Sequence, residues 1–252
     1  MYDYIFDRIT NGDMSDGNKR IARKFFRFCM AEGLCPRRMQ RLVDYLLKLD
    51  ALLPCDYDGL NRTHAETLWA KINAMDEFSD WTKYTFKCAI RKFYRWMGEG
   101  YLKHIAFKNR IPKTTILPQD LLSPEEIEAI IGNASNLEMR AIYSILYETG
   151  ARINEVLSLK PGDIMFDDFG TLMTLRDKKT KTTRIVRVVE ITDFLRDFTG
   201  RLPKDEKIFR KSYNTYFHRH IITLEKSGIT KHVKFHLFRH TRASYLGRFL
   251  PE

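Results

Sequence analysis

The sequence predicts a mainly α-helical protein with a small antiparallel β-sheet, an α+β fold divided between two domains. Apolar residues recur at helical spacing through the first hundred residues. The pattern changes to alternation only at 171–176 and 184–190, as expected for paired strands. Between Lys103 and Leu122 no period is present, and prolines with basic residues mark a linker. With 252 residues available, we predict a helical domain at 1–105, a linker at 106–122 and a second domain at 123–252.

Four amphipathic helices with short connections are expected in the first domain. Capping residues, prolines and glycines place them at about 15–32, from Pro36 onward, after the capping box 63–66, and at 80–97. The last of these helices is expected to bury an apolar stripe that contains Trp81, Ala89, Phe93 and Trp96 or their close neighbours.

The other face of that last helix carries cations spaced by four residues, namely Lys83, Lys87, Arg91 and Arg95. Like charges at this spacing repel one another by a few tenths of a kcal/mol per pair. A row of phosphates would neutralise them, so the stripe predicts a DNA contact. The alternative is a face that is merely solvated, which is the usual outcome for an isolated charge stripe.

The second domain has a clear start. Ser123, Pro124 and Glu126 combine a capping box with proline at the first helical position. After a turn at 161–163, the two predicted strands are joined by a polar loop, and this hairpin region is rich in cations: Arg176, Lys178, Lys179, Lys181, Arg184 and Arg187. Such density suits a DNA groove, although lysines on an exposed strand also prevent aggregation. A further helix is expected at 212–227.

The composition indicates a folded basic protein. The formal net charge is +11, and both signs of charge are interspersed, so nucleic acid is the natural partner. A membrane surface is the rival partner, but the sequence has no run of about 18 apolar residues, secretory signal or lipidation motif. The cysteines lack C-x-x-C spacing, and no motif for a divalent metal is present. We therefore expect a soluble intracellular protein without metal or other cofactor.

Thr149–Glu155 is the stretch that organises the second domain. Gly150 follows an apolar-periodic helix and is expected to end it in a left-handed conformation. Arg152 would then lie on the first turn of a new helix, where unpaired N–H groups favour an anion, such as a phosphate. We expect Arg152 to face solvent until DNA arrives, so that its replacement by alanine would not unfold the protein. The alternative is a simple ion pair with Glu155.

A second stretch, Lys234–Thr241, places His236 and Arg239 on one helical face. Together, T-G-A-R-x-x-E at 149–155 and H-x-x-R-H at 236–240 resemble the tyrosine recombinase, or phage integrase, family. The resemblance implies a helical core-binding domain followed by a catalytic domain, the two forming a C-shaped clamp around double-stranded DNA. It implies that Arg152 and Arg239 clamp the scissile phosphate and that His236 acts as acid/base or hydrogen-bond donor. His240 also matches the family pattern, but a residue adjacent to Arg239 on a helix points elsewhere, so we expect it to be structural.

The resemblance also implies a hairpin lysine that protonates the 5′-hydroxyl, and a tyrosine that forms a 3′-phosphotyrosyl link without metal. Counting back from Arg184 favours Lys179 for this role, with Lys178 and Lys181 as neighbouring DNA-binding residues. Tyr245 is the only tyrosine after Arg239 in this sequence. It follows Arg239 too closely to be the family's nucleophile, so we expect it to be a core residue. The nucleophile is then absent because the chain is a truncated fragment, because it was lost in nature, or because another chain supplies it.

The sequence Leu-Phe-Arg-His-Thr-Arg-Ala-Ser around Arg239 and the closing Leu-Pro-Glu are similar to sequences of archaeal and viral integrases. A site-specific recombinase of a mobile element is therefore expected, acting as a homo-oligomer, a tetramer on its recombination site. We expect this prokaryotic or viral protein to be cytoplasmic and associated with the nucleoid. Two alternatives remain at this stage. One is a non-catalytic DNA-binding relative that occupies or bridges recombination sites, and the other is an enzyme similar to type IB topoisomerases.

Overall fold

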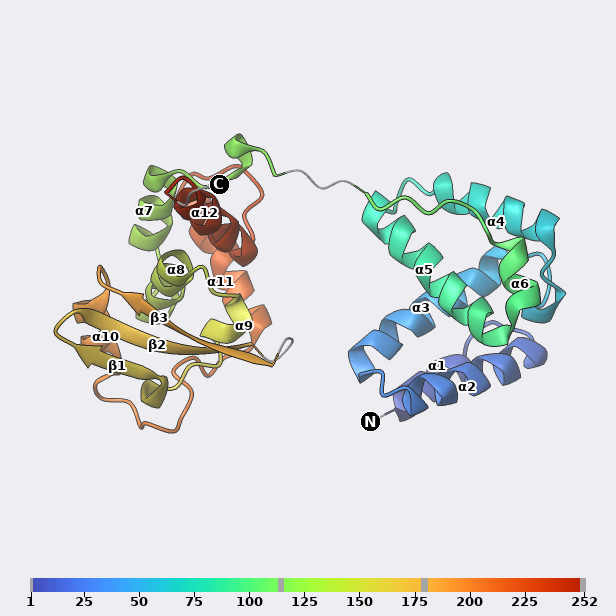
Figure 1. The fold of residues 1–252 in the computed structure, drawn as a ribbon, viewed down its shortest axis with the longest axis horizontal. Coiled ribbons are helices and arrows are strands. Elements are labelled where there is room, and N and C mark those ends of the chain that lie inside the picture. The colour runs from blue at the N-terminus through green and yellow to red at the C-terminus, as the bar shows by residue number, and fades with distance from the viewer. Residues whose placement is uncertain (1, 113–115, 178–180, 250–252) are drawn as a thin grey trace. The chain divides into compact units, whose positions relative to one another are not determined.

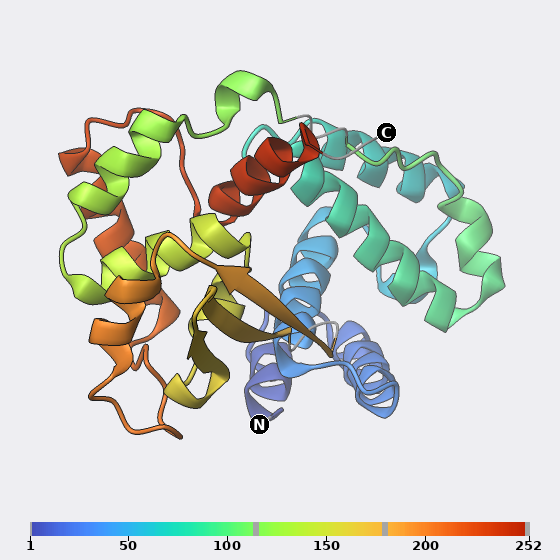
Figure 2. The same ribbon diagram turned by 60° about the vertical axis from the view of Figure 1, so that its left-hand side comes forward.

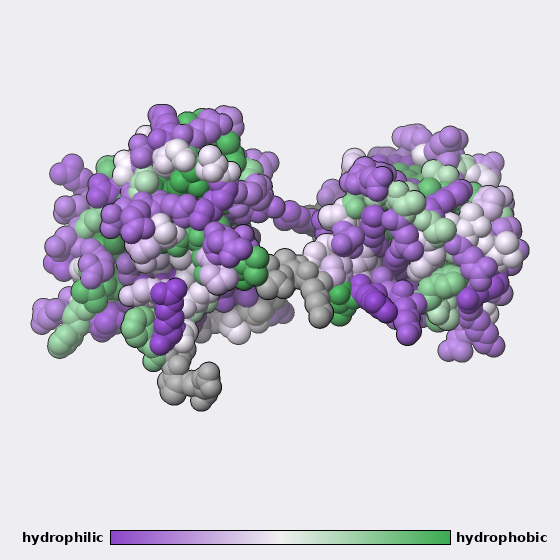
Figure 3. Space-filling view, turned by 90° about the horizontal axis from the view of Figure 1, so that it is seen from above, coloured by the Kyte–Doolittle hydropathy of each residue, from purple (hydrophilic) through white to green (hydrophobic). Residues whose placement is uncertain are grey.

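The computed structural model describes residues 2–112, 116–177 and 181–249. The chain divides into two compact units, Met1–Thr114 and Thr115–Glu252 (Figure 1), and this boundary falls within the stretch 106–122. In the described ranges, the helices are all too short or too polar to cross a membrane. Hydrophilic side chains cover much of the visible face of each unit, with small hydrophobic areas between them (Figure 3).

Unit 1 is entirely helical over its described residues. Its α-helices are α1 (Asp3–Thr10), α2 (Asp16–Ala31), α3 (Pro36–Leu52), α4 (Arg62–Asn73), α5 (Asp80–Met97) and α6 (Glu99–His104), with a 3₁₀ turn at Tyr57–Gly59. The four predicted helices are confirmed as α2 to α5. The short helices α1 and α6 were not predicted, because eight and six residues hold too few turns for a helical period to be visible.

The core of unit 1 is aromatic. Phe25, Phe86 and Phe93 are each about 1% exposed or less, and Phe25 meets Phe93 edge-to-face at 5.1 Å between ring centroids. The predicted burial of Trp81 is wrong, because its side chain is 44% exposed at the first turn of α5. The predicted burial of Phe93 is confirmed, and the buried stripe of α5 also contains Phe86, Ile90 and Tyr94.

Unit 2 mixes helices with one small sheet (Figure 2). Its elements are α7 (Pro124–Gly132), α8 (Leu137–Thr149), α9 (Ile153–Val156), β1 (Ile164–Asp167), β2 (Gly170–Asp177), β3 (Thr182–Val188), α10 (Thr192–Thr199), α11 (Tyr213–Lys226) and α12 (Phe235–Gly247), with 3₁₀ turns at Pro118–Asp120 and Pro161–Asp163. The strands are antiparallel in the order β1-β2-β3. The predicted hairpin is confirmed, and Asp177 pairs with Thr182 at its end.

Helix α8 is the centre of unit 2. Residues 141–146 of α8 are all buried, and α8 packs against α7, α9, α11, α12 and β3. The capping box at Ser123 is present as predicted, with the Ser123 hydroxyl accepting from the Glu126 N–H at 3.2 Å. Because α8 ends at Gly150 and α12 crosses beside it, the two sequence stretches singled out above meet at one place.

A buried histidine fixes the start of α12. His220 of α11 is 0% exposed. Its Nε2 lies 3.1 Å from the Val233 carbonyl and donates to it, so its Nδ1 accepts from the Tyr143 hydroxyl at 3.1 Å. Burial lowers the pKa of His220 to about 4, and its ring stacks on Phe235, the first residue of α12, at 4.5 Å. The neutral imidazole therefore joins α8, α11 and the segment that leads into α12.

Candidate active site

The turn after α8 is built on a glycine. Gly150 has φ +59°, a left-handed conformation that costs an L-residue about 1–2 kcal/mol. Its N–H closes the helix by donating to the Leu146 carbonyl at 3.0 Å, so the predicted helix end is confirmed. The reversal leaves Ala151 buried and brings Arg152 to the surface immediately before α9.

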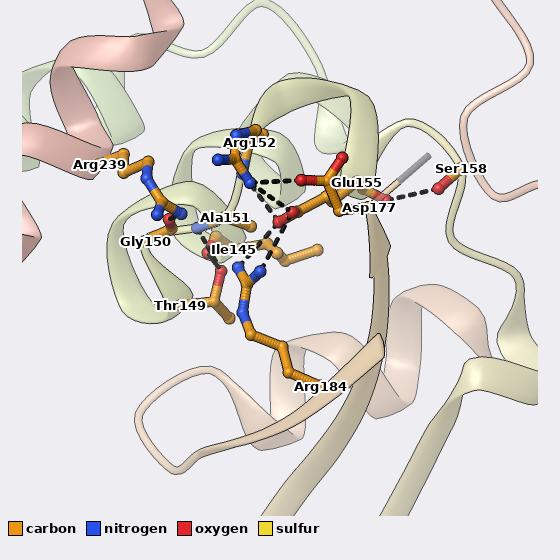
Figure 4. Close-up of polar contacts among 10 residues, drawn as sticks. All are labelled: Ile145, Thr149, Gly150, Ala151, Arg152, Glu155, Ser158, Asp177, Arg184 and Arg239. Atoms are coloured by element: carbon orange, nitrogen blue, oxygen red, sulfur yellow. Dashed lines mark hydrogen bonds and ion pairs between the residues drawn. The ribbon is translucent and has the colours of Figure 1, made fainter. Parts of the chain in front are cut away.

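Arg152 is the N-cap of α9 rather than a residue of its first turn. Its backbone N–H donates to Oε2 of Glu155 at 3.0 Å. Its guanidinium NH1 donates to Oδ2 of Asp177 at 2.6 Å and lies 3.4 Å from Oε1 of Glu155 (Figure 4). The ion pair with Glu155 is thus present. Arg152 faces solvent as expected, with a side chain that is 39% exposed, but two carboxylates already hold its NH1.

Glu155 is the buried anchor of this cluster, with 2% exposure. Both of its oxygens accept from Arg184 of β3, at 3.1 and 2.8 Å. Burial by itself would raise the pKa of Glu155, but hydrogen bonds from Arg184 and Arg152 outweigh burial and the pKa is lowered. The carboxylate is therefore charged at neutral pH, and it ties α9 to strand β3 of the hairpin.

Arg239 brings α12 to the same turn. Its NH1 donates to the Gly150 carbonyl at 2.7 Å, and Figure 4 shows it reaching the turn from the side opposite Asp177. His236, one turn earlier on α12, has its pKa lowered by partial burial and then by the positive charges of His240, Arg239 and Arg152. The structure thus brings Arg152, His236 and Arg239 together, as the sequence predicted.

His236 and His240 form a pair one helical turn apart. Their rings meet edge-to-face with 4.6 Å between centroids. Because burial and neighbouring cations both disfavour the imidazolium, His236 is neutral at pH 7 and can donate through one ring nitrogen while it accepts through the other.

The predicted hairpin residues are described only in part. Lys178 and Lys179 lie outside the described residues, whereas Lys181 is exposed with φ +55° in the turn. Three other hairpin cations form ion pairs, since Arg176 pairs with Asp163, Arg184 with Glu155 and Arg187 with Asp167.

The predicted DNA stripe on α5 makes contacts within unit 1. Lys83 donates to the Asn73 carbonyl at 2.8 Å, and Lys87, 8% exposed, donates to Oδ1 of the same residue at 2.5 Å. Burial, followed by the charges of Lys83 and Arg91, lowers the pKa of Lys87. The side chains of these two α5 lysines reach the carboxyl end of α4, where the helix dipole favours cations. Arg91 donates to the Phe107 carbonyl, so only Arg95 of the stripe is strongly exposed.

A larger basic surface lies between α3 and α5. A hollow of about 900 Å³ there is lined by the cations Arg37, Arg38, Arg41, Lys92 and Arg95. The sequence reasoning missed the three arginines of α3. The signal that could have found them is their spacing after Pro36, because positions 37, 38 and 41 share one side of a helix that buries Met39 and Leu42 on the other.

Tyr245 is not a core residue. It is 42% exposed on α12, with the Phe249 ring 5.3 Å away and the Arg242 guanidinium 5.8 Å from its centroid. The prediction that it is buried is wrong, because the last turns of α12 are exposed from Ala243 onward. Over the described ranges, no group of three His, Cys, Asp or Glu side chains is placed to hold a metal ion.

Comparison with known proteins decides the family. Residues 120–248 match the sequence profile of the Phage integrase family. The chain belongs to the phage integrase family. It is similar to the tyrosine recombinase XerC of Rickettsia bellii, with 29% identity over 176 residues, and to that of Rickettsia africae, with 31% identity over 180 residues. Each alignment covers 63% of this chain and 57% of the relative, so the chain spans a little over half the length of these relatives.

Solved structures show the same fold. A lambda integrase (75–356) dimer bound to a COC′ core site has a TM-score of 0.73 at 15% identity, covering 90% of this chain and 89% of that chain. XerH site-specific recombinase bound to difH substrate has a TM-score of 0.65 at 16% identity, covering 98% of this chain and 84% of that chain. The reported curated relatives are bacterial, so the affiliation with archaeal or viral integrases stays a prediction.

Proposed function

We propose that this chain is a site-specific DNA recombinase that binds duplex DNA and cleaves and rejoins strands by metal-free phosphoryl transfer through a 3′-phosphotyrosine. The observation that carries the proposal is the convergence of Arg152, His236 and Arg239 on the turn at Gly150. The arrangement comes from two segments more than 80 residues apart, as the 2.7 Å bond between Arg239 and Gly150 records. Both the family match and the fold support it.

The chemistry follows from the residue types. Attack on a phosphodiester increases the negative charge on the non-bridging oxygens, which fixed guanidinium groups stabilise. Arginine suits this role because its planar fork binds two oxygens at once and stays charged. His236, held neutral, would donate a hydrogen bond to the phosphate. We assign Lys179 as the acid that protonates the leaving 5′-hydroxyl, because lysine can release a proton whereas arginine cannot.

Tyr245 is not the nucleophile in this proposal. It follows Arg239 by six residues on α12, and six residues of α-helix rotate a side chain by about 600°, so the two side chains point about 120° apart. A second candidate function is a non-catalytic relative that occupies or bridges recombination sites, because the same phosphate-binding groups, Arg152, His236 and Arg239, would serve it.

We place the main DNA contact of unit 1 on the hollow between α3 and α5, with the predicted α5 stripe represented there by Arg95. Each phosphate neutralised by such cations adds about −0.9 to the slope of log K against log salt. Relatives of this fold include a lambda integrase tetramer bound to a Holliday junction. We propose that this chain likewise assembles as a homotetramer on its DNA site.

The test begins with a duplex selected by the immobilised chain from a random-sequence pool. Covalent protein–DNA product is then scored on a denaturing gel with a nicked version of that duplex, from which the cleaved end diffuses away, both for these 252 residues and for a protein extended through the following codons. In the form that gives product, we expect Arg152→Ala and Arg239→Ala to abolish it and Arg187→Ala, which removes a cation from a surface pair, to leave it intact. Product that survives Arg239→Ala would overturn the proposed mechanism.

The duplex selection, which reports binding, and the denaturing gel, which reports covalent product, together separate the two candidate functions. Selective binding that weakens on Arg152→Ala, without covalent product from any variant of the 252-residue chain or of the extended protein, would establish the non-catalytic relative. Binding without any sequence selection would exclude both candidates.

A further inference from the structure

The shortest contact of the Arg152 side chain is with a residue outside both family stretches. NH1 of Arg152 lies 2.6 Å from Oδ2 of Asp177 and 3.4 Å from Oε1 of Glu155. Both oxygens of Glu155 also accept hydrogen bonds from Arg184, whereas Asp177 gives the Arg152 guanidinium a short, charge-assisted hydrogen bond. Asp177 is therefore the stronger of the two anchors of this guanidinium.

Asp177 is itself rigidly placed. It is 6% exposed and is the last residue of β2, where the ladder pairs it with Thr182 of β3. A buried carboxylate requires charged or hydrogen-bonding partners to remain ionised, and Arg152 supplies one of them. The two residues thus hold each other, although 25 positions separate them in sequence.

The contact leaves part of the guanidinium available. In the described ranges, the hydrogen bonds of the Arg152 side chain all use NH1, so the edge formed by Nε and NH2 is directed elsewhere (Figure 4). The Arg152 side chain is 39% exposed. An arginine fork can bind a phosphate through one edge while a carboxylate holds the other nitrogen.

We infer that Asp177 is a positioning residue for the reaction, which holds NH1 so that the Nε–NH2 edge of Arg152 meets the scissile phosphate in a fixed orientation. The inference rests on the proposed function, in which Arg152 binds that phosphate. Asp177 immediately precedes Lys178 and Lys179 in the sequence. The same carboxylate therefore links the phosphate-binding arginine to the base of the hairpin that carries the proposed general acid.

Asp177 could instead compete with the phosphate for Arg152, and the two roles make opposite predictions. If Asp177 positions Arg152, the contribution of Arg152 to DNA affinity becomes smaller when Asp177 is replaced. If Asp177 competes with the phosphate, the contribution of Arg152 to DNA affinity becomes larger when Asp177 is replaced. A double-mutant cycle measures this difference directly.

The experiment is a set of binding titrations with the full chain and the selected duplex at one salt concentration, in which fluorescence anisotropy measures binding. The variants are Arg152→Ala, Asp177→Asn and their combination. We expect Arg152→Ala to weaken binding at least tenfold in the wild-type background but less than threefold beside Asp177→Asn. In the Asp177→Glu background, Arg152→Ala should again weaken DNA binding almost as much as in the wild type. In the control background Asp167→Asn, which removes one negative charge from the surface pair with Arg187, Arg152→Ala should weaken DNA binding as much as in the wild type.

Equal effects of Arg152→Ala in the two backgrounds, or a larger effect beside Asp177→Asn, would overturn the inference. A DNA-free readout separates this failure from failure of the proposed function. The ¹⁵N relaxation of the Arg152 Nε–H should show an ordered side chain in the wild type and in Asp177→Glu, and a mobile one in Asp177→Asn. An ordered side chain in Asp177→Asn would contradict positioning even if the chain bound no DNA.

Discussion

Acidification tests the buried histidine that fixes the start of α12. His220 is 0% exposed and its pKa is lowered to about 4, against about 6.5 in an unfolded chain. Below pH 6.5 the His220 side chain therefore binds a proton in the unfolded state but stays neutral in the folded state until the pH approaches 4. Stability must fall as the pH drops from about 6.5 to about 4, and it is fully present above that window.

The magnitude follows from the shift. A fall in the pKa from about 6.5 to about 4, at about 1.4 kcal/mol for a change of one in pKa, gives a loss of about 3.5 kcal/mol from unit 2 once the pH is below both values. This is a large part of the stability of an ordinary domain. Because protonation also breaks the Nδ1 acceptor bond from Tyr143, the loss should be accompanied by loosening between α8 and α11.

The assay must report on unit 2 alone. The three tryptophans, Trp69, Trp81 and Trp96, all lie in unit 1, so tryptophan fluorescence follows the wrong unit. Urea unfolding monitored by amide NMR signals of α8 and α11 is suitable, at pH values between 7 and 4.5. The control is His220→Gln, which keeps polar atoms but cannot titrate, and the wild-type minus control difference removes the contribution of carboxylates.

We expect that difference to decrease steadily as the pH falls below 6.5. A parallel pH dependence of the two proteins would refute the reasoning. So would an NMR titration in which the His220 ring protonates near pH 6.5 in the folded protein.

Three further predictions concern the turn and its neighbours. Gly150→Ala should destabilise unit 2 by about 1–2 kcal/mol, because φ is +59° while the added Cβ would meet only Arg242 at an ordinary 3.7 Å. Gly132→Ala, in helix α7 with open space around it, should be neutral or stabilising in the same urea titration. Arg152→Ala should cost about 1–3 kcal/mol even without DNA, since it removes a partner of the buried Asp177 carboxylate, and an unchanged urea midpoint would contradict this. In the form of the protein that gives covalent DNA product, Tyr245→Phe should leave that product unchanged on the denaturing gel, and its loss would identify Tyr245 as the nucleophile.

The sequence by itself determined the features whose causes are local. Helix α7 begins at Ser123 because the cap, the proline and Glu126 lie within four residues, and α8 ends at Gly150 because glycine alone takes that conformation without strain. The hairpin followed from alternation over β2 and β3. The motif stretches likewise predicted that Arg152, His236 and Arg239 belong to one site.

Tertiary structure decided the partners. Arg152 and Asp177 meet only because β2 ends beside α9, and no periodicity in the sequence encodes that approach. Lys87 was predicted to face phosphates, but the end of α4 closes over it. Tyr245 was predicted to be buried, but it is exposed because no described element covers the last turns of α12. Short-range rules fix where an element begins and ends, whereas the burial and pairing of a charged side chain depend on which distant segment packs against it.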